Sequence, residues 1–156
     1  MHTHLHYILV PLFYFAVAQV GSSFTLQGVS SWYPSIITPS YTPPGAVIGA
    51  VWTIIYILSA VSLIVFANTA KGTRVLWITG GLYVLNGVVN ALWSYLFFVR
   101  HMLFLSFLDA LLIWLTVGLL IVNTWPYSRL SSMLLVPYFL WVSFASYLNF
   151  VIYRLN

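Results

Sequence analysis

Long apolar runs, separated by short polar or charged stretches, dominate this sequence of 156 residues. Five runs are long enough to cross a hydrocarbon core of ~30 Å as helices, which takes roughly 20 residues each. We predict spans at 5–23, 44–67, 75–99, 102–125 and 130–153. Membrane strands need only about ten residues and alternate polar with apolar positions, a pattern that these runs lack. The sequence therefore predicts an all-α integral membrane protein, a single-domain bundle of five transmembrane helices.

The connections between the runs are short, apart from the stretch 24–43. This stretch contains Pro34, Pro39 and Pro43, and proline disrupts helix interiors. Long loops in compact domains are often functional, for example as lids. We predict a lid loop between the first two helices. With five crossings, the lid, the turn at Arg100 and the end of the fifth run lie on one side.

The first run has a second interpretation. Residues 16–18 (AVA) resemble the cleavage site of a signal peptide, but no Lys or Arg precedes Lys71, so we favour a retained span. His2, His4 and His6 alternate and could suggest a metal site. We interpret them as solvated terminal residues, and we predict no metal site.

Composition points to lipid as the surrounding medium. Charged residues make up 4% of the chain and hydrophobic residues 62%, whereas an ordinary soluble domain has about 25% charged residues. The cations lie at the ends of the apolar runs, as interfacial anchors do, and do not form the basic stripe of a nucleic-acid-binding protein. The absence of cysteine excludes disulfides and thiolate metal sites.

Asp109 is the only acidic residue and lies in the middle of the fourth run. An ionisable group inside a membrane is costly and is a candidate functional group. A structural hydrogen-bonding role and a direct role in ligand or proton chemistry both remain open. Asn86 and Asn90 are four residues apart and share one helix face with Trp93 close by. Their partners are either other helices or a ligand.

Several tryptophans, Trp52, Trp93, Trp114 and Trp141, lie inside apolar runs and away from the interfacial belts. They indicate either an aromatic-lined cavity or packing between helices. Trp141, Ala145 and Asn149 form a stripe with helical spacing, which leaves room for a planar group or for a neighbouring helix.

Small residues four apart allow helices to approach closely. Gly87 and Ala91 have this spacing in the third run, and Gly45 and Gly49 have it in the second. Contacts within a chain and between subunits are both open.

Four segments resemble the tryptophan-rich sensory protein/translocator protein family (TspO/MBR, the peripheral-type benzodiazepine receptors). Residues 32–44 (WYPSIITPSYTPP) resemble the loop signature of the family, and residues 52–56 (WTIIY) its W-T-x-L-Y run. Residues 86–98 (NGVVNALWSYLFF) and 137–149 (PYFLWVSFASYLN) are similar to two further stretches. The matches occur in order and cover the chain from about residue 32 onwards.

The resemblance implies a pocket beneath the lid that binds porphyrin-type tetrapyrroles, with sterols and isoquinoline or benzodiazepine drugs among the ligands of the family. It implies no required cofactor and a homodimer formed through Gly87 and Ala91. Our default expectation for the location is a bacterial inner membrane. The candidate ligand-binding residues are Tyr33, Pro44, Trp52, Asn86, Asn90, Trp93, Asp109, Trp141, Phe144, Ala145 and Asn149.

The resemblance implies two functions: a porphyrin receptor or translocator, and a light-dependent porphyrin-degrading enzyme that uses Trp52 and Trp141. A third hypothesis is a structural or assembly protein whose tryptophans serve packing alone. Thr38 stands where the family has a loop lysine, so Arg100 or Arg154 would have to pair with a porphyrin propionate. Phe150 stands where the sterol motif of the family has tyrosine, which argues against strict sterol recognition.

Overall fold

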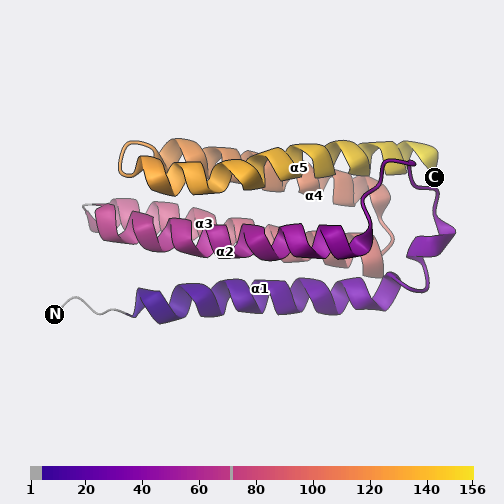
Figure 1. Cartoon of the computed structure of the whole chain (residues 1–156), viewed down its shortest axis with the longest axis horizontal. Helices are drawn as coiled ribbons and strands as arrows, with labels where there is room; N and C mark the ends of the chain where they lie inside the picture. Colours follow the sequence, from indigo (N-terminus) through magenta and orange to yellow (C-terminus); the bar gives the residue numbers. More distant parts are fainter. Residues whose placement is uncertain (1–4, 71) are drawn as a thin grey trace.

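The computed structural model describes residues 5–70 and 72–156 and contains five long helices (Figure 1). These are α1 (His6–Gly28), α2 (Gly45–Thr69), α3 (Thr73–Ser94), α4 (Leu103–Thr124) and α5 (Arg129–Leu155). Each is long and apolar enough to cross a membrane, when α3 is taken together with its continuation to Val99. The described part of the chain has no strand. The predicted all-α membrane fold is confirmed.

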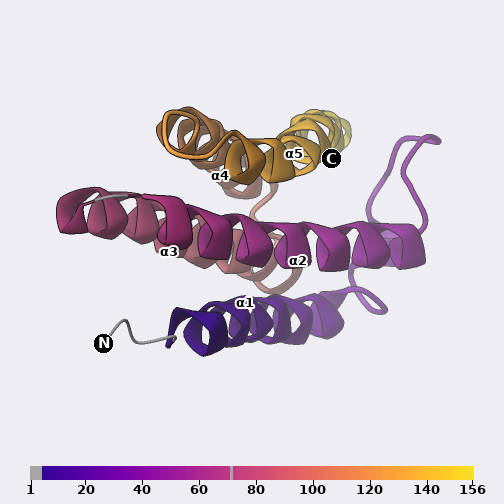
Figure 2. The same ribbon diagram turned by 60° about the vertical axis from the view of Figure 1, so that its left-hand side comes forward.

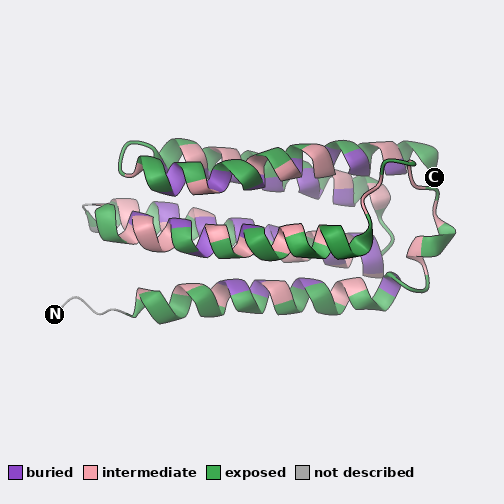
Figure 3. Cartoon of the chain, in the orientation of Figure 1, coloured by how far each residue is buried: buried purple, intermediate pink, exposed green. Residues whose placement is uncertain are grey.

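The helices alternate in direction and pack in three levels, which both ribbon views show (Figures 1 and 2). One outer level is α1, the middle level holds α2 and α3, and the other outer level holds α4 and α5. In addition to the α4–α5 contact, α1 contacts both α2 and α3, α2 packs against α5, and α3 packs against α4. The residues coloured as buried lie mainly on the faces that the helices turn toward one another (Figure 3).

Helix α1 ends at Gly28, beyond the expected end at residue 23. Its polar residues do not stop the helix, because the Ser23 hydroxyl donates to the Val20 carbonyl (2.7 Å) and the Thr25 hydroxyl to the Gly21 carbonyl (2.9 Å). Hydroxyls satisfied in this way are tolerated within a helix. The connection to α2 is correspondingly shorter than 24–43, and it contains a 3₁₀ turn, η1 (Tyr33–Ser35).

Helix α3 passes directly into a π-helical turn, η2 (Tyr95–Val99). The Arg100 amide donates to the Tyr95 carbonyl (3.0 Å), five residues back. Gly28 lies against this turn, and a Cβ at Gly28 would collide with the Phe98 carbonyl. Glycine therefore allows α1 to approach the backbone at the end of α3.

The lid, the turn between η2 and α4, and the end of α5 meet at one end of the bundle. The rings of Trp32 and His101 are stacked, with their centroids 4.1 Å apart. The Ile37 amide donates to the Asn156 side-chain oxygen, and the Asn156 amide donates to the Ile37 carbonyl, both at 2.9 Å. The side grouping predicted from five crossings is confirmed.

The opposite end of the bundle is filled by buried side chains, which we call the floor: Ser62, Phe66, Tyr83, Ser131 and Leu135, each 0% exposed. The Ser62 hydroxyl donates to the Ser131 carbonyl (2.7 Å), and the Ser131 hydroxyl donates to the Ser62 carbonyl (2.9 Å). The floor ties α2, α3 and α5 together.

The start of α1 is held against the end of α2. A ring nitrogen of His6 lies 3.0 Å from the side-chain oxygen of Asn68. His2 and His4 lie outside the described residues. Within the described ranges, no group of three histidine, cysteine or acidic side chains could hold a metal ion.

Candidate functional site

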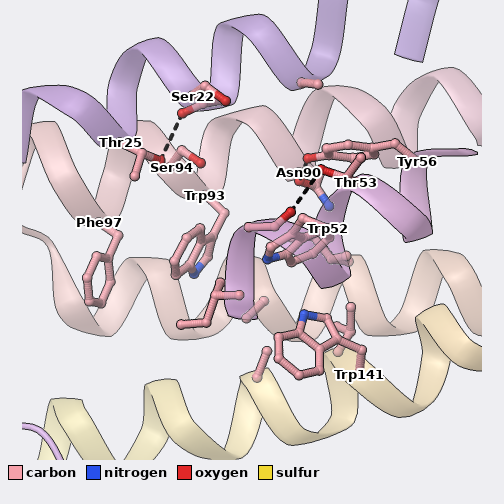
Figure 4. Close-up of a pocket in the computed structure, with 18 of the residues that line it drawn as sticks. Ser22, Thr25, Trp52, Thr53, Tyr56, Asn90, Trp93, Ser94, Phe97 and Trp141 are labelled. Carbon is pink, nitrogen blue, oxygen red and sulfur yellow. Dashed lines mark hydrogen bonds between the residues drawn. The ribbon is translucent and has the colours of Figure 1, made fainter. Parts of the chain in front are cut away.

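A cavity of about 770 Å³ lies between the helices beneath the lid, and along α1 and α2 its lining reaches Pro11 and Ile64, at the level of the floor. It is lined by α1, α2, α3 with η2, α4 and α5, and Tyr33 and Pro43 contribute from the lid. Figure 4 shows side chains from several of these helices around it. Its volume falls in the range of ~300–1,000 Å³ that is typical of sites for small molecules and cofactors.

Three tryptophans from three helices contribute indoles to the wall: Trp52 on α2, Trp93 on α3 and Trp141 on α5 (Figure 4). Neighbouring rings hold them in place. Trp93 stacks on Phe97 with centroids 5.0 Å apart, and Trp52 meets Tyr138 edge-on at 5.9 Å. The cavity is therefore bounded by flat, apolar surfaces in fixed orientations.

The indole N–H groups of two of these tryptophans differ in their hydrogen bonding. Trp93 donates to the Asn149 side-chain oxygen (3.1 Å). The N–H of Trp141 is buried and has no partner among the described residues. A buried polar group without a partner costs free energy, so the Trp141 N–H is a donor available to a ligand.

A chain of hydrogen bonds leads from the cavity wall across the bundle. The Tyr56 hydroxyl donates to Asn90 (2.7 Å), and Asn90 donates to the Tyr138 hydroxyl (2.9 Å). Tyr138 donates to Asn86 (3.0 Å), which donates to Thr116 (2.8 Å). Because the Tyr56 hydroxyl donates its hydrogen to Asn90, the Tyr56 oxygen offers the cavity an acceptor.

The lid contributes a tyrosine whose ring faces the end of α3. The Tyr33 ring centroid lies 5.9 Å from that of Phe98 and 6.1 Å from that of Phe97. Burial raises the pKa of the Tyr33 phenol, so this phenol is neutral at physiological pH and can donate a hydrogen bond.

Most of the candidate residues named from the sequence do line the cavity. These are Tyr33, Trp52, Asn90, Trp93, Trp141, Phe144, Ala145 and Asn149. Three do not: Pro44 precedes α2 as its N-cap, Asn86 lies deeper in the hydrogen-bond chain, and Asp109 is buried beside the lining residue Ala110. One carboxyl oxygen of Asp109 is buried and has no partner within the described ranges.

Gly87, a candidate for a dimer interface, packs inside the chain. A Cβ at Gly87 would lie 2.6 Å from the Phe13 ring and 3.1 Å from a Val17 methyl group, both on α1. This glycine therefore allows α1 to approach α3. Ala91 is half-buried on the same helix. The homodimer remains a prediction.

Sequence reasoning missed the contribution of α1, which includes Gly21, Ser22 and Thr25. No motif marks that helix, so no signal pointed to it. Two other missed residues lie within quoted motifs: Tyr56 follows Trp52 by one helical turn, and Phe97 follows Trp93 by one turn. Residues one turn apart share a helix face, and that rule could have identified both.

The fold and the site together define a class: a multi-pass integral membrane protein with an aromatic-walled cavity under a lid. Comparison with known proteins makes the assignment more specific. The model of the TspO/MBR family matches residues 7–154, and the chain belongs to this family.

Individual relatives agree with this assignment. The chain is 39% identical over 127 residues to the tryptophan-rich protein TspO of Bacillus cereus, covering 81% of each chain. It is 35% identical over 141 residues to the protein of the same name from Chlorobaculum tepidum, covering 90% of this chain and 89% of the relative. Protein CrtK of Rhodobacter capsulatus is 31% identical over 95 residues, covering 61% and 59%. These relatives are bacterial, and location in the inner membrane stays a prediction.

Proposed function

We propose that the chain is a membrane receptor or translocator that binds a porphyrin-type tetrapyrrole in the cavity and acts in transport or sensing. The observation that carries the proposal is the cavity of about 770 Å³, with Trp52, Trp93 and Trp141 on its wall. Sites for flat apolar ligands combine such surfaces with a few placed polar groups.

A planar macrocycle would contact the indoles, and each well-oriented aromatic contact adds about 0.5–1.5 kcal/mol beyond burial of area. The Trp141 N–H and the Tyr56 oxygen supply one donor and one acceptor. Acidic substituents would lie toward the lid end, where Arg100 and Arg154 are exposed. Those two cations take the place of the loop lysine of the family, which is Thr38 here.

The test is a titration of detergent-purified protein with protoporphyrin IX, followed by quenching of tryptophan fluorescence. We expect saturable quenching at micromolar ligand, and we expect Ala145→Thr to weaken it because a larger polar side chain would enter the cavity. Ala46→Thr is the matched control, since Ala46 is an exposed α2 residue outside the lining. No quenching of the unaltered chain would leave a structural or assembly role. Unchanged affinity in Ala145→Thr would remove Ala145 from the binding site.

Light-dependent porphyrin degradation is the second candidate. Trp52 favours it, because this cavity tryptophan has ring contacts with Tyr56 (5.7 Å) and Tyr138 (5.9 Å), which could share an electron deficiency. Porphyrin absorbance under illumination separates the two candidates. If Trp52→Phe and Trp141→Phe bind porphyrin but no longer bleach it, while the lipid-facing control Trp77→Phe still does, the chain is catalytic. Equal bleaching in all variants leaves binding alone.

A further inference from the structure

We infer that the ligand enters and leaves the cavity sideways, from the hydrocarbon of the bilayer, through a window between α1 and α2. This inference deepens the proposed function and rests on it. It specifies the route by which the ligand moves between the cavity and the bilayer. Four boundaries of the cavity point to this route: the floor, the lid, the seam between α1 and α3, and the seam between α1 and α2.

The floor closes the cavity at the end opposite the lid. Phe66, Tyr83 and Leu135 are 0% exposed, and none of them lines the cavity. The paired serines Ser62 and Ser131 join α2 to α5 at this level. A bulky ligand passing this way would have to break these contacts, so a route through the whole thickness of the bundle is closed.

The lid closes the other end and is fastened at two points. Trp32 stacks on His101, and both the N–H and the C=O of Ile37 bond to the Asn156 side chain. Tyr33 and Pro43 lie over the cavity. A ligand could pass this end only if the ring stack and the hydrogen bonds to Asn156 were broken.

Helix α1 packs tightly against α3 and the π-helical turn η2. A Cβ at Gly28 would collide with the Phe98 carbonyl, and one at Gly87 would meet the Phe13 ring at 2.6 Å. Further along, a Cβ at Gly21 would come within 3.5 Å of the Ser94 hydroxyl. The ring of a porphyrin could not pass between these two helices.

The seam between α1 and α2 differs, because cavity-lining residues follow it on both helices, from Pro11 and Ile64 to Leu26 and Gly45. His6 meets Asn68 at the far end, and this antiparallel register brings Thr25 level with Gly49. A Cβ at Gly49, like one at Gly45, would meet nothing within 4 Å. We call the gap bordered by Ser22, Thr25, Gly45, Gly49 and Thr53 the window.

Residues beside the window face outward and line the cavity at the same time. Leu26 is 71% exposed and Ile57 is 58% exposed, yet both belong to the cavity wall. Figure 4 shows Ser22 and Thr25 on α1 and Thr53 on α2 among the lining side chains. The Thr53 hydroxyl donates to the Gly49 carbonyl (2.9 Å), so it can face lipid without losing a partner. The window is therefore a lipid-compatible opening.

The experiment measures the rates of protoporphyrin IX binding and release by tryptophan quenching, with the chain in phosphatidylcholine–phosphatidylglycerol nanodiscs. We expect Gly49→Phe to slow both rates about tenfold, equivalent to ~1.4 kcal/mol of added barrier, while the Kd changes little. The matched control is Gly81→Phe, on the outward face of α3, where a Cβ also meets nothing within 4 Å. This control should leave the rates unchanged.

Asn156→Ala distinguishes the lid as the alternative route, because it removes one fastening of the lid. If Asn156→Ala binds and releases porphyrin faster while the rates of Gly49→Phe are unaltered, the ligand passes the lid, and the proposal that it passes the window is wrong. A weaker Kd without slower exchange in Gly49→Phe also overturns it, since Gly49 would then be only a ligand contact. If the unaltered chain shows no quenching, the proposed function fails and the window is decided by a second measurement.

That second measurement needs no porphyrin, because the chain has no native cysteine to react. The thiol of an Ala145→Cys variant lies in the cavity wall. We expect an apolar maleimide dissolved in the bilayer to modify this thiol, Gly49→Phe to slow the modification, and a charged, water-soluble maleimide to react poorly. Equal modification by the charged reagent, or no slowing by Gly49→Phe, overturns the window.

Discussion

The two halves of the bundle are built from the same apolar helices, but they use their side chains differently. In the floor half, Phe66, Tyr83 and Leu135 are fully buried, with no exposed surface. In the lid half, Trp52 and Trp141 border a cavity of about 770 Å³. Apolar composition therefore places a helix in the membrane but does not determine whether its inner face packs or encloses a space.

The difference arises from side-chain size and polarity at each level. The floor has serines small enough to let helices approach, and their hydroxyls bond across α2 and α5. Near the lid, the large indoles hold the helices apart, and Gly49 has no neighbour to fill the gap. The floor thus supplies rigidity, and the lid half supplies space.

The largest effect on stability is expected when a large side chain is removed from the floor. Phe66→Ala should destabilise the protein by about 3–5 kcal/mol, because a buried ring would leave a cavity. Phe15→Ala is the matched control, since Phe15 is 62% exposed beside the cavity, and it should cost far less. Thermal unfolding in detergent measures both. Equal losses would show that the two halves do not differ in packing.

A smaller effect is expected from adding one methyl group to a glycine. Gly28→Ala should destabilise by about 1–3 kcal/mol, as overpacking does, because the new Cβ would collide with the Phe98 carbonyl. Gly49→Ala meets open space, and it should be neutral or stabilising by up to about 1 kcal/mol because alanine favours helix. Thermal unfolding of the pair tests the contrast, and a reversed order would contradict the close approach of α1.

Removing one hydroxyl from the hydrogen-bond chain should have a more modest effect. Tyr138→Phe leaves Asn90 without an acceptor and Asn86 without a donor. We expect a loss of about 1–2 kcal/mol, the range for polar contacts between membrane helices. Tyr153→Phe, at an exposed tyrosine of the same helix, should change nothing. Equal unfolding temperatures for the two variants would indicate that the hydrogen bonds through Tyr138 add no stability.

The smallest global effect is expected at the lid. Asn156→Ala removes side-chain bonds to Ile37, each worth about 0.5–1.5 kcal/mol at most and less where exposed. Unfolding of the bundle should hardly change, whereas hydrogen exchange at the Ile37 amide should speed up. Protection of that amide in the variant would show that the fastening does not depend on Asn156.

Much of the fold could be predicted from the sequence, because the bilayer allows so few architectures. Five long apolar runs with short connections leave an antiparallel bundle as the natural solution. The predicted end of α1 at Ser23 is too early, because the sequence places the residues from 24 onwards, Thr25 among them, in the loop. The hydroxyls of Ser23 and Thr25 bond to the carbonyls of their own helix, and composition does not show this.

The site was predictable where a motif or a stripe marked it. Trp52, Trp141 and Ala145 line the cavity. Trp52 lies in a quoted motif, and Trp141 and Ala145 lie in the α5 stripe, for which the spacing allowed either a planar group or a neighbouring helix. The sequence could not separate Asn90, which lines the cavity, from Asn86, one turn away and sealed behind it. Nor could it find the contribution of α1, because that depends on how closely two helices approach.

The floor also has an electrical consequence. A hollow inside a membrane protein shortens the insulating path for ions, and a passage open at both ends would discharge the membrane. Here the space beyond the cavity is occupied by Phe66, Tyr83 and Leu135, and moving a charge through such material is costly. The chain can therefore hold a ligand-sized space in the bilayer while the membrane keeps its voltage, so vesicles containing it should retain a proton gradient as long as empty vesicles do.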